Sequence, residues 1–277
     1  MRIGDLGARP IVPVAVHMHP WIEALARLGL AAKGIVYLLV GMIAARAALL
    51  HRGGPKNQAG ALVEILHQPL GTALLTAIGV GLAAYVAWRL VQALLDPERL
   101  GTGGKALAVR AGRLITAIIY GGLALVAFRL ASGEAARVTH PRELGKGLLA
   151  HTGGWLLLGG IGIGVIVYGI WELSRGVRGS FMRDLRGELL NRRSWRWALH
   201  LGQIGLVARG VVLALLGWFA LRAAFDEEAR GIQGLDGALR FIAGHAGTTS
   251  LAIVGIGLAA YGLFELIEAR YRRIAPL

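Results

Sequence analysis

The sequence contains no cysteine, and only 17% of its 277 residues are charged. The lack of cysteine excludes disulfide bonds, thiolate-bound zinc or iron–sulfur sites, and catalysis by a thiol. Soluble domains carry about 25% charged residues. The scarcity of charge and a mean hydropathy of +0.59 therefore exclude both an ordinary soluble domain and a disordered chain. Pro is also scarce, with 8 residues, whereas Gly is abundant, with 42, which in so apolar a chain indicates close helix–helix contacts.

Six apolar stretches are long enough to cross a bilayer, which takes about 20 helical residues. They cover residues 24–50, 70–95, 105–131, 153–173, 198–225 and 248–269. The predicted fold is therefore all-α, an integral membrane protein with six transmembrane helices.

An internal repeat groups the six spans into three units. Lys33-Gly34-Ile35-Val36-Tyr37 is followed by an equivalent segment at residues 116–120, 83 positions later, and by another at 209–213, 176 positions later. The pattern Gly-x-Gly-x-x-x-Tyr-x-x-aromatic keeps the same offsets and begins at Gly79, Gly162 and Gly255. Each unit has two spans, so all units enter the membrane in the same direction, unlike inverted repeats. We expect three parallel helical hairpins, arranged about a pseudo-threefold axis or in a row.

The repeat also predicts how the chain is divided. We expect an irregular lead-in at residues 1–20, hairpin repeats at 21–100, 101–179 and 198–277, and a basic amphipathic segment at 180–197. In that segment Phe181, Leu185 and Leu189 recur at helical spacing beside several arginines, which is typical of a helix lying in the membrane interface. The linkers within the units, such as residues 236–243, are expected to form short surface helices.

The net charge is +14, with basic residues clustered beside the apolar spans. Anionic lipid headgroups are therefore a nearer partner than nucleic acid, which we do not expect. Basic residues are more frequent in the loops on the side of the two termini, and this bias predicts cytoplasmic termini.

Basic side chains also interrupt the first span of each unit. Lys33 and Arg46 enclose only 12 uncharged residues, as do Arg209 and Arg222, and 13 helical steps cover only about 20 Å. One interpretation is snorkelling, in which these side chains extend to the two interfaces. The other is a pair of basic rings that bind lipid phosphate or attract an anion. The candidate lipid or anion contacts are Lys33, Arg46, Arg129, Arg209 and Arg222.

Arg89, Glu172 and Glu265 occupy equivalent positions near the ends of the second spans. A cation in one unit and carboxylates in the other two predict ion pairs between units, with a proton relay as the alternative. Tyr85, Tyr168 and Tyr261 are also in register, each about one turn from an outer aromatic residue (Trp88, Trp171 and Phe264). We expect the outer aromatics to form an interfacial belt and the tyrosines to lie deeper, in hydrogen bonds between helices, with contact to a quinone or pigment as the alternative.

Small residues on one helix face are expected to pack against neighbouring helices. The predicted packing residues are Gly34, Gly41, Gly79, Gly81, Gly160, Gly164, Gly210, Gly217, Gly255 and Gly257. The sequence lacks a metal-binding motif, a phosphate loop and a nucleophile–base set, so we predict no metal, no cofactor and no catalytic residue.

The sequence resembles a family of bacterial membrane proteins that carry three tandem two-helix modules and are known only as a domain of unknown function. The resemblance depends on residues 27–37 (RLGLAAKGIVY), 235–239 (LDGAL) and 255–265 (GIGLAAYGLFE), and it covers most of residues 21–269. The middle unit departs from the pattern, because Thr116 replaces the basic residue. The resemblance implies a six-helix protein of the bacterial inner membrane, and it implies no reaction or ligand.

These observations favour a non-enzymatic scaffold or accessory subunit that packs with other membrane proteins, as in a larger membrane protein complex, and binds anionic lipid. The alternative is a small channel or transporter for an anion or another small solute, and an enzyme is the weakest hypothesis.

Overall fold

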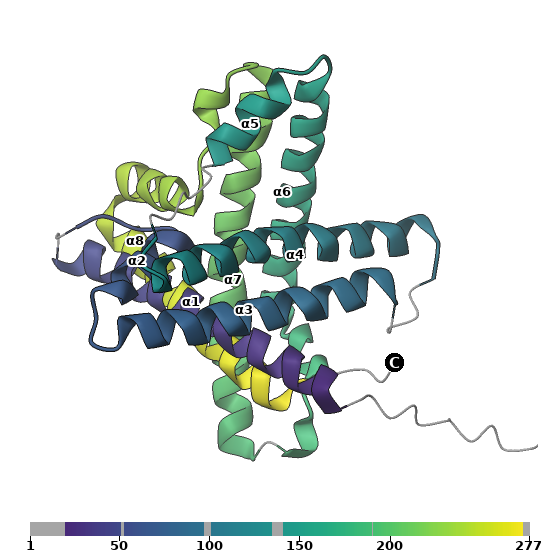
Figure 1. Cartoon of the computed structure of the whole chain (residues 1–277), viewed down its shortest axis with the longest axis vertical. Helices are drawn as coiled ribbons and strands as arrows, with labels where there is room; N and C mark the ends of the chain where they lie inside the picture. Colours follow the sequence, from purple (N-terminus) through teal and green to yellow (C-terminus); the bar gives the residue numbers. More distant parts are fainter. Residues whose placement is uncertain (1–19, 51–52, 97–100, 135–140, 190, 274–277) are drawn as a thin grey trace, which may run out of the picture.

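The computed structural model describes residues 20–50, 53–96, 101–134, 141–189 and 191–273 (Figure 1). These residues form helices joined by turns, and no strand occurs among them apart from an isolated bridge between Leu185 and Arg272. The helices are α1 (Pro20–Leu50), α2 (Gln58–Leu66), α3 (Gly71–Leu94), α4 (Gly104–Ala131), α5 (Pro141–Leu149), α6 (Gly154–Arg178), α7 (Arg192–Phe225) and α8 (Leu235–Tyr271), with short 3₁₀ turns η1 (Ser180–Asp184), η2 (Gly187–Leu189) and η3 (Ala229–Gly231).

Six of the described helices are long and apolar enough to cross a membrane: α1, α3, α4, α6, α7 and α8. The sequence-based prediction of an all-α membrane protein with six spans in three repeats is confirmed. The short helices α2 and α5 precede α3 and α6, and the first turns of α8 are their counterpart in the third repeat. Within α8, Gly247 has a φ of 82° and separates these turns from the long span.

The six long helices pack in the lateral order α4–α3–α1–α8–α7–α6. Figure 1 shows α3 lying beside α4 and α6 beside α7, and the same relation holds for α8 and α1. Each of these pairs joins the second helix of one repeat to the first helix of the next, and the pair α8–α1 joins the third repeat back to the first. The order would form a ring if α4 and α6 also packed together. Among the described residues, these two helices do not pack along their lengths.

Glycines set the closest crossings between repeats. A Cβ atom on Gly41 would lie 2.6 Å from the Gly255 carbonyl oxygen, and one on Gly34 would lie 2.8 Å from that of Gly262. The crossing of α6 and α7 has the same form, because a Cβ atom on Gly217 would lie 2.6 Å from the carbonyl oxygen of Gly162. The backbones approach closely only because these positions lack a side chain.

The other predicted packing glycines divide into two groups. Gly79 contacts Phe128, and Gly81 and Gly257 face alanines of the first helix in their own repeats. By contrast, a Cβ atom on Gly160 or Gly164 would have no heavy atom of another helix within 4 Å, so α6 presents both glycines to open space. The exposure of Gly164 follows from the missing contact between α4 and α6, because the equivalent Gly81 and Gly257 are covered. The position of Gly160 is exposed in all three repeats.

The basic segment at residues 180–197 differs from the expected interfacial helix. It consists of the short turns η1 and η2, followed by the first turns of α7. Phe181 and Leu185 are fully buried, and the Phe181 ring meets that of Phe264 edge to face at 4.9 Å. Phe181 and Leu185 thus pack into the end of the bundle. They are buried more completely there than a side chain lying on a membrane surface would be. The predicted irregular lead-in lies almost wholly outside the described residues.

The glycine crossings predict a specific sensitivity to added volume. Gly41→Leu should lower the free energy of unfolding by about 1–3 kcal/mol, since the new side chain overlaps the α8 backbone. Thermal unfolding in mild detergent measures this change. Gly122→Leu is the matched control, because Gly122 faces open space and the equivalent positions already carry Leu39 and Leu215. Equal losses in the two variants would contradict the role assigned to Gly41.

Candidate functional site

The bundle interior contains a cluster of charged side chains and tyrosines at three equivalent positions between repeats. Site A lies between α8 and α1, site B between α6 and α7, and site C between α3 and α4. In each site, the second helix of one repeat supplies residue 265, 172 or 89, and the first helix of the next supplies residue 33, 209 or 116. The three sites therefore share one framework and differ in the charges that it carries.

Site A is a buried ion pair. The Lys33 ammonium donates hydrogen bonds to Glu265 Oε1 at 2.6 Å and to the Tyr261 hydroxyl at 2.7 Å. Lys33 is 5% exposed and Glu265 is 2% exposed. The Tyr261 ring meets that of Tyr37 edge to face at 4.9 Å, so aromatic side chains seal the pair from the bilayer.

Site B repeats this arrangement with an arginine. Arg209 donates to Glu172 Oε1 and, through Nε, to the Tyr37 hydroxyl at 3.3 Å. The Arg209 guanidinium also lies over the Tyr261 ring, 5.0 Å from its centroid. Tyr37 and Tyr261 therefore connect sites A and B into one continuous cluster.

Both glutamates leave one carboxylate oxygen without a hydrogen-bond partner. Glu172 Oε2 and Glu265 Oε2 are the buried side-chain polar atoms in the described residues that lack one. A buried unsatisfied acceptor costs about 1–3 kcal/mol. The same atom is unsatisfied at two equivalent positions, so the feature belongs to the repeat architecture.

Site C has the same framework with a different charge. Tyr85 and Tyr120 meet edge to face at 4.9 Å, as Tyr261 and Tyr37 do in site A. Arg89 takes the glutamate position and donates to the Tyr85 hydroxyl at 2.6 and 2.9 Å and to Gln92 Oε1 at 3.0 Å. Thr116 takes the cation position and donates to the Gly112 carbonyl oxygen. Arg89 has no carboxylate partner among the described residues.

A further set of contacts follows the same repeat. Arg27 of α1 donates to the carbonyl oxygens of Ala269 and Arg270 at the end of α8. Arg110 of α4 donates to the equivalent carbonyls of Ala93 and Leu94 at the end of α3. Gln203 of α7 makes the corresponding bond to Val177 of α6 at 3.4 Å. These side chains satisfy carbonyl groups that a helix end leaves free.

The sequence-based reasoning missed these capping contacts, although positions 27, 110 and 203 follow the repeat offsets. It also placed Lys33 and Arg209 at a membrane interface. In the structure both side chains point into the bundle instead, because a glutamate from the neighbouring repeat lies within reach. Among the expected partners, Glu172 and Glu265 lie in ion pairs between repeats, whereas Arg89 does not meet a carboxylate of the described chain.

The other three candidate basic residues lie toward the opposite ends of the first helices. Arg46 contacts Glu64 at 3.3 Å, and Arg222 contacts Asp226 at 3.4 Å. Both arginines are largely exposed, and Arg129 is half-buried without an ion pair to a described residue. On α2, a hydrogen bond from Lys56 and the nearby charges of Lys56 and Arg46 hold the pKa of Glu64 below its usual value.

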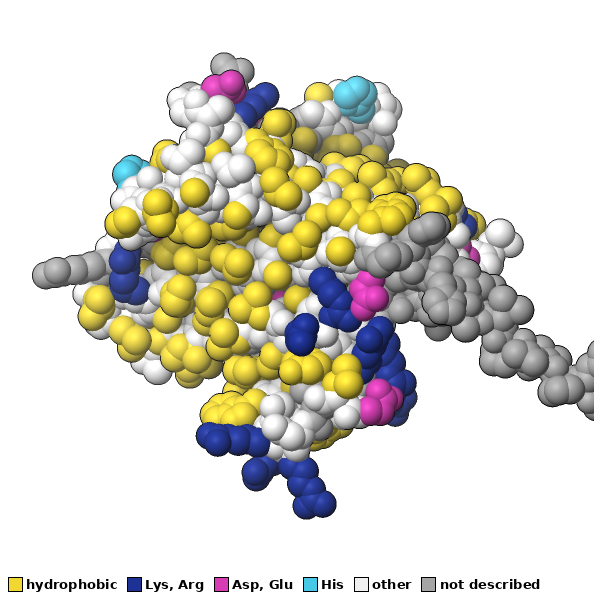
Figure 2. All heavy atoms as spheres, turned by 60° about the horizontal axis from the view of Figure 1, so that its bottom comes forward, with side chains coloured by type: hydrophobic (Ala, Val, Ile, Leu, Met, Phe, Trp, Pro, Cys, Tyr) yellow, Lys and Arg dark blue, Asp and Glu magenta, His cyan; other side chains and the backbone are white. Residues whose placement is uncertain are grey.

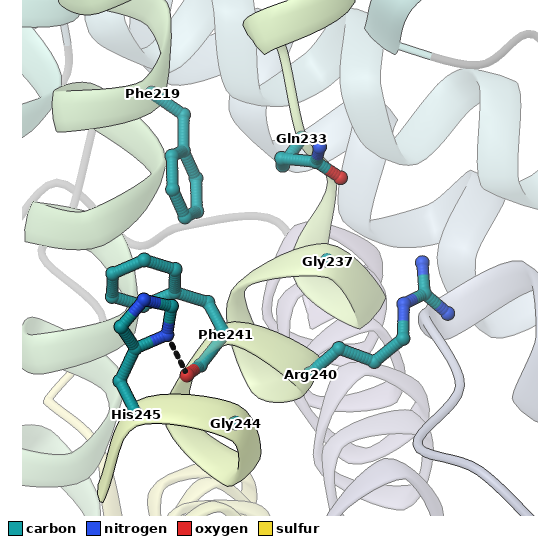
Figure 3. A pocket seen from close by; sticks show the side chains of 7 residues that line it. All are labelled: Phe219, Gln233, Gly237, Arg240, Phe241, Gly244 and His245. Carbon is teal, nitrogen blue, oxygen red and sulfur yellow. Dashed lines mark hydrogen bonds between the residues drawn. The ribbon is translucent and has the colours of Figure 1, made fainter.

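An open pocket of about 310 Å³ lies beside the first turns of α8 (Figure 3). Phe219, Phe241 and His245 form one wall, and the His245 ring stacks on Phe241 at 4.0 Å. His245 Nδ1 lies 3.1 Å from the Phe241 carbonyl oxygen, and Arg240 is paired with Asp236. The described residues contain no group of three or more His, Cys, Asp or Glu that could hold a metal ion. Arg240 and His245 are therefore held by local partners, and the buried cluster remains the better candidate site.

The buried pair at site A predicts a large effect of removing one charge. Glu265→Gln should lower the free energy of unfolding by about 3–5 kcal/mol, because Lys33 loses its counter-charge inside the bundle. The double variant Lys33→Met, Glu265→Leu should cost less, since no unpaired charge remains. Unfolding followed by tryptophan fluorescence in detergent compares these variants.

Glu64→Gln is the control, because it breaks a pair that is partly exposed and should change stability by less than about 1 kcal/mol. If the double variant were as unstable as Glu265→Gln, loss of the counter-charge would not be the cause.

Comparison with known proteins agrees with the threefold arrangement. The family described as Domain of Unknown Function (DUF1206) matches three times in tandem, at residues 28–96, 111–179 and 204–272. The chain is 31% identical over 256 residues to "Uncharacterized protein YxxB" of Bacillus subtilis (strain 168), covering 92% of this chain and 93% of that protein. No solved structure matches the chain. The chain therefore belongs to the DUF1206 family of membrane proteins, with one copy of the domain for each two-span repeat.

Proposed function

We propose that the protein is a non-enzymatic scaffold or accessory subunit of the bacterial inner membrane, with both termini in the cytoplasm. In this proposal the middle repeat receives a transmembrane helix of a partner protein, and basic residues hold anionic lipid. The main support for the proposal is the incomplete packing of the middle repeat.

The first and third repeats each form a closed hairpin. A Cβ atom on Gly29 of α1 would lie 2.5 Å from the Tyr85 backbone of α3, and one on Gly205 of α7 would lie 2.5 Å from that of Tyr261. The equivalent pair in the middle repeat is Gly112 and Tyr168. Gly112 faces open space, and Tyr168 is 44% exposed. The middle repeat thus has both halves of a helix-packing surface without the contact between them.

The small residues of this surface are still present in the sequence. Gly112 and Gly164 occupy positions that are glycine in all three repeats, and in the outer repeats a neighbouring helix covers each of them. A glycine inside a helix costs about 1 kcal/mol relative to alanine. Two such residues facing open space fit a surface that another helix fills. Large apolar side chains beside them, including Ile115 and Ile163, are more than half exposed.

The distribution of surface charge supports the lipid part of the proposal. Figure 2 shows apolar side chains over much of one face, with Lys and Arg gathered in groups and few acidic side chains among them. The segment before and at the start of α7 contributes Arg183, Arg186, Arg192, Arg193 and Arg196. Each basic contact near an anionic membrane surface contributes about 1 kcal/mol.

The alternative hypothesis, a small channel or transporter for an anion, stays a prediction. The ion pairs and tyrosines of sites A and B fill the interior, and the outer Arg46 and Arg222 already have acidic partners. These contacts favour a scaffold over a protein with a water-filled channel.

The absence of native cysteine allows a direct test of the open repeat. In an Ala32→Cys, Gly81→Cys variant, oxidation should link α1 to α3 after the helices separate by about 1 Å, because the two Cβ atoms would otherwise lie 2.5 Å apart and a disulfide needs about 3.5–4.5 Å. The equivalent variant Ile115→Cys, Gly164→Cys should not form this internal bond in native membranes. Non-reducing electrophoresis after proteolysis between the two positions separates the outcomes. Efficient internal bonding in both variants would mean that the middle repeat closes on itself, and the proposal would fail.

Partner binding is tested by filling the surface. Gly164→Leu should convert a larger complex isolated in mild detergent into the free protein, as measured by size-exclusion chromatography with light scattering. Gly147→Leu in the short helix α5, where the glycine also faces open space, is the control and should leave the complex intact. A wild-type protein that is monomeric under the same conditions would also contradict the proposal.

A further inference from the structure

Site C has an uncompensated positive charge. Sites A and B each combine one cation with one carboxylate, whereas site C has Arg89 at the carboxylate position and neutral Thr116 at the cation position. The described partners of Arg89 are a tyrosine hydroxyl and an amide oxygen, both uncharged. A guanidinium within a membrane-spanning segment is costly without a counter-ion. Comparison with sites A and B therefore predicts that an anion from outside the cluster neutralises Arg89.

The geometry of Arg89 leaves room for such an anion. A guanidinium has five N–H donors, and Arg89 makes three hydrogen bonds to Tyr85 and Gln92. The remaining donors match the oxygens of a phosphate, which guanidinium groups bind in a bidentate manner. Lys33 and Arg272 are the other cations whose fields interact with this region, and their carboxylate partners, Glu265 and Glu268, neutralise them locally.

The surroundings of site C also differ from those of the sealed sites. Arg89 is half-buried, whereas the ion-paired Glu172 and Glu265 are fully buried. Arg89 lies five residues, or about 8 Å, before the end of α3, a depth that a lipid headgroup reaches at the edge of the hydrocarbon region.

The charge of the surrounding helix ends favours an anion as well. Arg110 and Arg113 of α4 donate to carbonyl oxygens at the end of α3, which places two more guanidinium groups beside the same end of site C. The described acidic residue at this end, Asp96, accepts from the Gly101 amide. The net charge of the described side chains at this end of site C is therefore positive.

We propose that Arg89 at site C binds the phosphate of an anionic phospholipid, which acts as the third counter-charge of the cluster. The lipid takes the place that Glu172 and Glu265 fill at the other two sites. This lipid site rests on the lipid-binding part of the proposed function, makes it specific, and is independent of partner binding at Gly164.

The repeat itself provides the decisive variant. Arg89→Glu combined with Thr116→Arg would convert site C into a copy of site B, with Glu on the second helix and Arg on the first. This double variant should keep the fold and lose the bound lipid. Arg89→Gln should also lose the lipid, and its lower stability would be separated from that loss by comparison with the double variant. Arg240→Gln, which removes an exposed arginine that has no assigned lipid contact, is the control for non-specific charge.

The measurement is native mass spectrometry of protein purified in mild detergent, followed by titration of delipidated protein with phosphatidylglycerol, phosphatidylcholine or inorganic phosphate. Wild type and Arg240→Gln should retain phosphatidylglycerol. Both Arg89 variants should bind it at least about tenfold more weakly, as expected for loss of a charge-assisted hydrogen bond.

Undiminished phosphatidylglycerol binding by the folded double variant would overturn the proposal. Binding of inorganic phosphate as tightly as phosphatidylglycerol would overturn the assignment to a lipid, and equal retention of phosphatidylcholine would overturn the assignment to an anion. The partner test at Gly164 uses a different readout, so either proposal can fail alone.

Discussion

A charge inside an apolar bundle must be neutralised by a neighbouring helix, because the bilayer core supplies neither water nor counter-ions. Lys33 and Arg209 each lie six residues, or about 9 Å, further into the bundle than Arg27 and Gln203, which contact the ends of the neighbouring helices. Each meets a glutamate from the preceding repeat in the cyclic order. The ion pairs therefore determine which helices must be neighbours and in what register.

The glycine crossings make those ion pairs possible. Gly34 is next to Lys33, and Gly210 is next to Arg209, so a close backbone contact and the charged contact occur at the same level of the bundle. A wider crossing would leave a gap that water or lipid would have to fill around the charges. At the α3–α4 interface, alanines replace the crossing glycines: Ala117 takes the position of Gly34 and Gly210, and Ala124 takes the position of Gly41 and Gly217. Arg89 and Thr116 at this interface do not form an ion pair. Close glycine packing and charge pairing thus occur together at two interfaces, and the third has neither at the equivalent positions.

The middle repeat combines two departures from the threefold pattern. Its first helix, α4, lacks the internal cation, and the described residues of its two helices do not pack along their lengths. Both departures expose groups that the other repeats bury. In a chain whose three units are otherwise equivalent, this asymmetry distinguishes one side of the bundle and makes it the natural place for a lipid or a partner helix.

The number of spans and the repeat offsets could be predicted from the sequence, because hydrophobic length and periodicity depend only on local composition. The repeat register also identified Glu172 and Glu265 as partners between units, and Gly34, Gly41, Gly210, Gly217 and Gly255 as packing residues. The inward direction of Lys33 and Arg209 emerged only from the folded bundle, since a long basic side chain can reach either an interface or a buried carboxylate from the same position. The burial of Phe181 and the exposure of Gly164 likewise depend on which distant helix arrives as a neighbour, and no local pattern specifies that.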